Sequence, residues 1–89
     1  MKVVWSEGAL VELRAVHDYI AQFSPLAAQR IAQRLIGAGD DLATLPDRGR
    51  PIGPGRRELA IIAPYLIRYL REDERVTILE VRHGAREPV

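Results

Sequence analysis

The residues best suited to chemistry are arginines and one histidine in the C-terminal half of the chain. Twelve of the thirteen basic residues are arginine, and nine of these lie from Arg48 to Arg86. A guanidinium offers a planar fork for phosphate, and a histidine can move a proton near neutral pH. If the C-terminal strands are neighbours, six side chains could converge: Arg56, Arg57, Arg68, Arg82, His83 and Arg86. A small metal-free ribonuclease needs such a set. The same charges could instead rim a protein-binding surface, and the residues alone favour this second interpretation.

Other common chemistries find little support in the sequence. The chain has no cysteine, which removes disulfides and thiolate sites. Ser6 and Ser24 are better explained as helix caps than as nucleophiles. His17 and His83 lie far apart and lack metal-ligand spacing, so we expect no metal site and no cofactor. The glycines at positions 49, 53 and 55 lack the pattern of a phosphate-binding loop.

The N-terminal half predicts a strand followed by a helical hairpin. Lys2–Trp5 is β-branched and aromatic, which favours a strand. Apolar residues at helical spacing predict one helix from about Glu7 to Gln22 and a second from Pro25 to the residue before Pro46. Because only a residue or two joins the helices, we expect them to pack antiparallel.

The C-terminal half predicts a loop and three strands. Three glycines and two prolines make 47–57 a loop, and the strands are expected at 58–63, 65–70 and 76–81. Short connections favour an antiparallel meander with its last two strands central. The fold class is therefore α+β in a single domain over residues 1–89, with the order strand–helix–helix–strand–strand–strand. The helical hairpin is expected to pack on a small antiparallel sheet of about four strands.

Composition restricts the partners and the compartment. The net charge is only +1, so we expect no direct sequence-specific binding of nucleic acid. No apolar run approaches the ~20 residues that a membrane span needs, and no signal-peptide pattern is present, so we expect a cytoplasmic protein.

An ordered set of motifs resembles the ParE-type toxins of the RelE/ParE superfamily, which includes plasmid stabilisation proteins. The N-terminal part is similar at Trp5-Ser6, Tyr19-Ile20-Ala21 and Ser24-Pro25. The C-terminal part is similar at Gly49-Arg50-Pro51, Arg57-Glu58-Leu59, Pro64-Tyr65-Leu66 and His83-Gly84-Ala85-Arg86. The resemblance covers nearly the whole chain and implies the fold reached above.

The superfamily has two functional branches, and the resemblance implies one of them. RelE-like members are ribosome-dependent mRNA endonucleases, whereas ParE-like members with an assigned target poison DNA gyrase. Nuclease-type members place a phosphate-binding arginine where this chain has Tyr65. They also follow the last strand with an aromatic ring that stacks on a base, whereas in this chain His83 is followed by Gly84 and Ala85. These differences favour a gyrase inhibitor that forms a hetero-oligomer with a ParD-like antitoxin encoded nearby.

Two alternatives stay open within the family. The chain could be a nuclease, with Arg68 replacing the missing arginine, or a member that binds its antitoxin without being toxic. If it is a nuclease, the catalytic candidates are Arg68, Arg82, His83 and Arg86.

The resemblance also implies candidate interaction residues. The C-terminal segment is implicated in toxicity in the family, and the nearby arginines join it, so the target-binding candidates are His83, Gly84, Ala85, Arg86, Arg56 and Arg57. The apolar candidates for antitoxin contact are Trp5, Tyr65, Ile67 and Tyr69, for which core packing is the alternative explanation.

Overall fold

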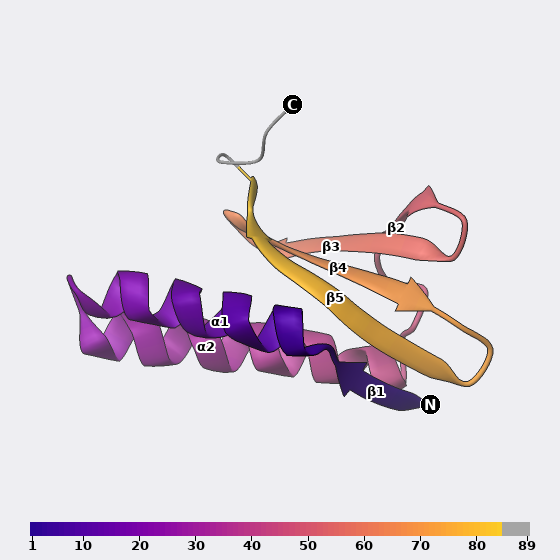
Figure 1. The fold of residues 1–89 in the computed structure, drawn as a ribbon, viewed down its shortest axis with the longest axis horizontal. Coiled ribbons are helices and arrows are strands. Elements are labelled where there is room, and N and C mark those ends of the chain that lie inside the picture. Colours follow the sequence, from indigo (N-terminus) through magenta and orange to yellow (C-terminus); the bar gives the residue numbers. More distant parts are fainter. Residues whose placement is uncertain (85–89) are drawn as a thin grey trace.

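The computed structural model describes residues 1–84 and shows a helical hairpin packed on a five-stranded sheet (Figure 1). The helical elements are α1 (Glu7–Ala21), α2 (Pro25–Asp40) and the 3₁₀ turn η1 (Asp41–Ala43). The strands are β1 (Lys2–Trp5), β2 (Arg50–Gly53), β3 (Arg56–Ile62), β4 (Tyr65–Arg71) and β5 (Arg75–His83). The predicted α+β class and the helical hairpin on a sheet are confirmed.

The sheet differs from the prediction in strand number and in one strand direction. Its order is β1-β5-β4-β3-β2, which places β4 and β5 in the interior as predicted. β1 runs parallel to β5, with Val3 opposite Val76, so the sheet is mixed. Part of the predicted 47–57 loop forms β2, which pairs with β3 through a turn at Gly55 with φ +68°. Pro51 is accommodated because β2 is an edge strand.

Both helices begin as their sequences predict. The Ser6 hydroxyl accepts a hydrogen bond from the backbone N–H of Ala9 at 3.0 Å. The Ser24 hydroxyl accepts one from Ala27 N–H at 3.1 Å, with Pro25 at the start of α2. The second helix ends earlier than predicted, because the chain tightens into η1 after Asp40.

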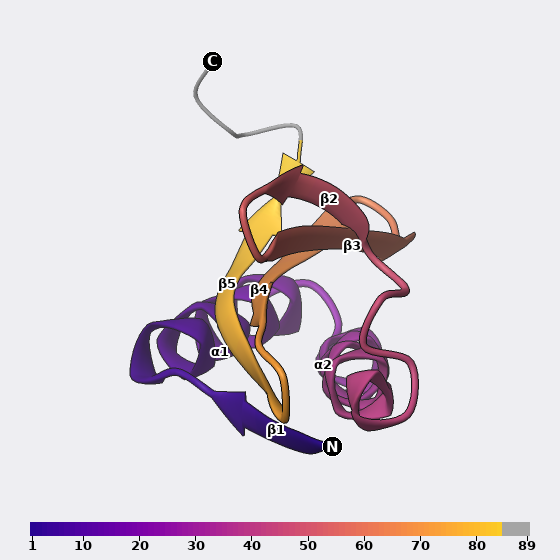
Figure 2. The same ribbon diagram turned by 90° about the vertical axis from the view of Figure 1, so that its right-hand side faces the viewer.

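The core lies between the hairpin and one face of the sheet (Figure 2). Its largest fully buried side chains are Tyr69, Leu35, Leu42, Ile67, Ile78 and Val76. Within residues 1–84 no helix covers the other face, which is called the open face below (Figure 1). No helix of this part of the chain is long and apolar enough to cross a membrane.

Tyr69 connects the core to the loop that leads into the sheet. Its hydroxyl donates to the Pro46 carbonyl at 2.7 Å and accepts from Gly49 N–H at 2.9 Å. Burial raises the pKa of this phenol, so it remains protonated and keeps its donor. These two hydrogen bonds therefore fix the position of the loop from which β2 begins.

Candidate functional site on the open face

The strand register brings charged side chains together on the open face. Glu58 on β3 lies opposite Arg68 on β4, and Arg68 lies opposite Glu80 on β5. On the outer side of β3, Arg50 of β2 also lies opposite Glu58. Directly opposed residues of antiparallel strands have their Cβ atoms about 5 Å apart, which suits ion pairs between strands.

These groups form a continuous row of ion pairs across the sheet, which we call the arginine–glutamate ladder. It consists of Arg50, Glu58, Arg68, Glu80, Arg82 and Glu12. Its closest contacts join Arg50 Nη2 to Glu58 Oε1 at 2.8 Å and Arg68 Nε to Glu58 Oε2 at 2.9 Å. Arg82 Nη1 lies 3.1 Å from Glu80 Oε2. Three arginines thus meet three glutamates, and the ladder carries little net charge.

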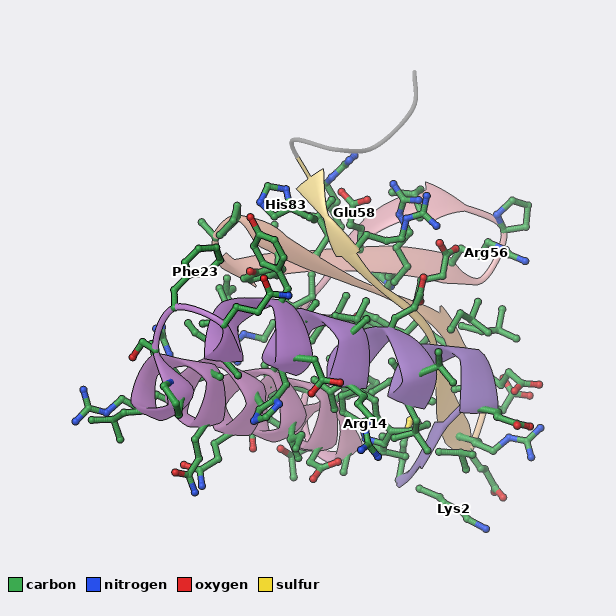
Figure 3. All side chains as sticks on the ribbon, turned by 60° about the vertical axis from the view of Figure 1, so that its left-hand side comes forward. Lys2, Arg14, Phe23, Arg56, Glu58 and His83 are labelled. Atoms are coloured by element: carbon green, nitrogen blue, oxygen red, sulfur yellow. The ribbon has the colours of Figure 1, made fainter. Side chains whose placement is uncertain are left out.

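Glu58 is the buried member of the ladder. Its side chain is 6% exposed, and both carboxylate oxygens accept from a guanidinium. Burial raises the pKa of this carboxyl, but hydrogen bonds and charge from Arg68 and Arg50 outweigh burial, so the pKa is lowered. Glu58 is therefore ionised at neutral pH. Figure 3 shows it on the side of the sheet away from the helices.

Glu12 links the ladder to helix α1. Strand β1 pairs with β5 only as far as Ile78, so the edge of β5 beyond it lacks a neighbouring strand. The Glu12 Oε1 atom accepts from Val81 N–H at 3.0 Å, and Glu12 Oε2 lies 3.9 Å from Arg82 Nη1. One carboxylate thus satisfies a backbone donor at the sheet edge and ends the row of charges.

Comparison with known proteins places the chain in a family. The family model described as "ParE toxin of type II toxin-antitoxin system, parDE" matches residues 3–88. The chain belongs to the ParE toxin family.

Relatives agree with this assignment. Toxin RelE2 of Caulobacter vibrioides is 53% identical over 85 residues, covering 96% of this chain and 97% of the relative. Toxin RelE1 of the same organism is 34% identical, covering 84% of this chain and 90% of that one. The putative toxin Y4kP of Sinorhizobium fredii is 39% identical, covering 93% and 88%. Both the ParE and the RelE names therefore occur among similar proteins.

A solved structure shares the fold. The chromosomal ParDE toxin–antitoxin system from P. aeruginosa contains a chain that matches with a TM-score of 0.79 at 24% identity, covering 93% of this chain and 95% of that one. The helical hairpin on a mixed sheet is thus the architecture of a solved member of a ParDE system.

In this ParE-family chain, only some of the predicted charged residues come together. Arg68 and Arg82 share the open face and both approach Glu80. Arg56, opposite Leu70 at the start of β3, is exposed and has no carboxylate partner within residues 1–84 (Figure 3). The predicted convergence therefore holds for part of the set.

Arg57 and His83 lie on the opposite face of the sheet. Arg57 donates to the carbonyls of Asp47 and Gly49 at 3.1 and 2.7 Å, so it braces the loop before β2. The His83 ring packs edge-on against Tyr65, with ring centroids 5.4 Å apart. Its Nδ1 atom is buried and has no hydrogen-bond partner in the described part of the chain. The histidine is therefore separated from the arginines of the ladder by the sheet itself.

The C-terminal toxicity candidates are described only in part. Gly84 is exposed and follows β5, where its N–H donates to the Pro64 carbonyl at 2.9 Å. Ala85 and Arg86 lie outside the described residues.

The apolar candidates for antitoxin contact lie in or beside the core. Tyr65, Ile67 and Tyr69 are 8%, 2% and 0% exposed. They therefore offer almost no apolar surface for an antitoxin to contact. Trp5 is partly buried against the core, and its Nε1–H donates to Asp40 Oδ1 at 3.0 Å. The exposed large apolar side chains include Val11, Phe23, Leu26, Leu45 and Ile61.

Sequence reasoning missed the carboxylates that organise the open face. The prediction placed Glu58 at the start of the strand at 58–63 and in a family motif, and Glu80 within the strand at 76–81, and it named neither as a site residue. The signal lay in the period-two pattern, because both glutamates and Arg68 occupy positions that alternate with the buried Leu59, Ile67 and Val81. Among the described residues, no group of three histidines and carboxylates could hold a metal ion.

Proposed function

We propose that this chain is the toxin of a type II toxin–antitoxin pair that acts in the cytoplasm by binding DNA gyrase. It blocks replication through this contact and performs no chemical step of its own. A ParD-like antitoxin, encoded nearby, neutralises it by forming a hetero-oligomer. Membership of the ParE toxin family supports the toxin assignment, and the open face supports the binding mode.

The observation that carries the proposal is that carboxylates hold the arginines of the ladder. In-line cleavage of RNA needs cationic groups that stabilise charge on the phosphate in the transition state. Arg68 would have to replace the arginine that the family's nucleases use, but its Nε lies 2.9 Å from the buried carboxylate of Glu58. Arg82 is held 3.1 Å from Glu80. A phosphate would have to displace these carboxylates.

The position of Tyr65 supports the same conclusion. By resemblance this residue stands where a nuclease has its phosphate-binding arginine, and its side chain is 8% exposed within the core. His83, the one histidine near the C-terminal strands, packs on that same Tyr65 ring. Arg68 and Arg82 thus lie on a different face of the sheet from His83, whereas acid–base catalysis needs all three within reach of one phosphate.

A second candidate function is ribosome-dependent mRNA cleavage. Arg68 and Arg82 do share an exposed face, and two similar proteins carry the name RelE. Contact with the ribosome would then have to open the ladder.

The test compares both activities with the same purified toxin. One assay measures supercoiling by gyrase with ATP, and the other measures cleavage of mRNA on ribosomes, each with and without antitoxin. We expect loss of supercoiling with accumulation of cleaved DNA, relieved by antitoxin, and intact mRNA. Intact supercoiling with cleaved mRNA would replace the proposal by the nuclease function. If the toxin shows neither activity, the result would favour a family member that binds its antitoxin without being toxic.

A further inference from the structure

A small pocket lies between helix α1 and the ends of strands β4 and β5. It has a volume of about 130 Å³, and its walls are formed by Ala15, Val16, Tyr19, Tyr65 and His83. We call it the aromatic pocket. Tyr65 and His83 are directly opposite each other in the register of β4 and β5, and their rings meet edge-on. Side chains from both layers of the fold therefore enclose this space.

A further aromatic ring extends the wall that Tyr19 forms. The Tyr19 and Phe23 rings pack edge-on, with centroids 5.6 Å apart, and the two residues are 44% and 74% exposed. Figure 3 shows Phe23 and His83 at the same end of the molecule. Sites for small molecules are typically lined by aromatic and apolar side chains with few polar atoms. The aromatic pocket has this composition.

One polar atom of the pocket wall lacks a partner. The Nδ1 atom of His83 is buried and makes no hydrogen bond with any of residues 1–84. Buried polar atoms are nearly always paired, so we expect this nitrogen to gain a partner when the pocket is filled. The torsion that orients an imidazole is soft, so rotation about Cβ–Cγ can turn Nδ1 toward the pocket. Over the same residues, the wall includes no lysine, arginine or carboxylate, which favours a neutral partner.

We propose that the aromatic pocket binds one neutral aromatic ring that carries a hydroxyl group, as phenols do. An apolar cavity of about 150 Å³ holds a benzene ring, so the volume of this pocket suits a single ring. Aromatic rings prefer edge-to-face contact, and Tyr19, Tyr65 and His83 provide partners for it. A hydroxyl both donates and accepts, so it pairs with His83 Nδ1 in either tautomer of the imidazole.

The hydroxyl and the neutral charge distinguish this ligand class from others. A ligand with a phosphate or carboxylate would meet no counter-ion in the described part of the wall. A purely apolar ring would leave the histidine nitrogen unpaired. Free phenols and the tyrosine side chain of another protein share the required chemistry, and the probes below distinguish these two sources. The site goes beyond the contact with gyrase and does not depend on it.

The test titrates the full-chain toxin with p-cresol and follows the NMR signals of the backbone amides and of the His83 ring. We expect p-cresol to bind with a Kd of about 1 mM or below. Toluene has the same ring without the hydroxyl and should bind about threefold to tenfold more weakly, because it leaves Nδ1 unpaired. His83→Phe keeps a ring but removes the nitrogen, so it should abolish the difference between the two probes.

Two substitutions on α1 locate the site. Ala15→Leu places a branched side chain in the wall and should weaken binding of p-cresol at least about tenfold. Val11→Leu is the matched control, since Val11 lies one turn earlier, is 64% exposed and does not line the pocket. Its affinity should stay within about twofold of the parent. Both positions are exposed on a helix, and circular dichroism of each variant checks that it is folded.

The outcomes separate the site, the ligand class and its source. No binding of p-cresol, or equal affinity in the parent and Ala15→Leu, would overturn the site. Equal affinity of the parent for p-cresol and toluene would overturn the pairing of a hydroxyl with His83. N-acetyltyrosinamide carries the same ring on a peptide backbone: tighter binding than p-cresol identifies a tyrosine side chain as the source, and weaker binding identifies a free phenol. Inhibition of gyrase is measured separately, so its failure would leave this site standing.

Discussion

Neutralising Glu58 should destabilise the protein through loss of its charge. Glu58→Gln keeps the shape of the side chain but leaves Arg68 and Arg50 without the carboxylate that lies within 3 Å of both. Breaking a fully buried ion pair costs about 3–5 kcal/mol, and the cost is smaller here because the Arg50 side chain is 69% exposed. We expect a loss of about 2 kcal/mol, which lowers the Tm by about 10 °C in a domain of this size.

The pH dependence identifies the charge as the cause. The pKa of Glu58 is lowered from its ordinary value of 4.5, so its ionisation stabilises the folded state in full above that value. This contribution declines as the pH falls below 4.5 and is lost once the pH is below the folded-state pKa. Urea denaturation should therefore show a parent-to-variant difference that is constant from pH 7 to about 5.5 and shrinks toward pH 3. The control Glu72→Gln removes an exposed pair with Arg75 and should change stability by less than about 0.5 kcal/mol. Equal stability of Glu58→Gln and parent at pH 7, or a difference independent of pH, would refute this reasoning.

Three further predictions follow from particular contacts. Glu58→Gln should raise the affinity for a labelled single-stranded RNA by about threefold to tenfold, because it releases guanidinium charge on the open face. Fluorescence anisotropy at low salt measures this affinity, and an unchanged value would mean that Glu58 does not restrain the arginines. Gly39→Ala should destabilise the protein by about 2 kcal/mol in urea denaturation, because its Cβ would lie 2.4 Å from the Trp5 ring and 2.7 Å from Ile78 Cδ1. Gly37→Ala should instead stabilise the protein by about 0.5–1 kcal/mol, because a Cβ there meets nothing within 4 Å and alanine favours the helix. Equal effects at both sites would contradict this packing. Tyr69→Phe should lower the free energy of unfolding by about 1–2 kcal/mol, because Gly49 N–H and the Pro46 carbonyl lose their shared hydrogen-bond partner. Thermal unfolding measures this loss, and an unchanged Tm would show that water replaces the hydroxyl without cost.

The elements of the fold were predictable where local physics determines them. Ser6 and Ser24 cap the two helices as expected, since a serine hydroxyl at this position accepts a hydrogen bond from an otherwise unpaired N–H of the first turn. The direction of β1 was not predictable, because parallel pairing with β5 joins residues more than seventy positions apart and leaves no local pattern. β2 was hidden by the glycines and prolines that an edge strand tolerates.

The candidate site was predicted only in its residue types. The sequence indicated that arginines of the last strands matter, and Arg68 and Arg82 do share a face. Strand alternation could have separated the predicted set, because Arg57 is in phase with buried Leu59 and His83 is in phase with buried Val81. The sequence did not indicate that Glu58 is a buried partner, since burial of a carboxylate depends on neighbours brought together by the fold.

The measurement that tests the account most directly is gyrase supercoiling beside ribosome-dependent mRNA cleavage, with the parent toxin and with Arg68→Ala. A toxin that acts by binding gyrase, with Arg68 committed to Glu58, should inhibit supercoiling while mRNA stays intact. Arg68→Ala should cleave no mRNA either and, when folded, should still inhibit gyrase. Cleavage of mRNA by the parent that is lost in Arg68→Ala, with gyrase unaffected by both, would contradict the account.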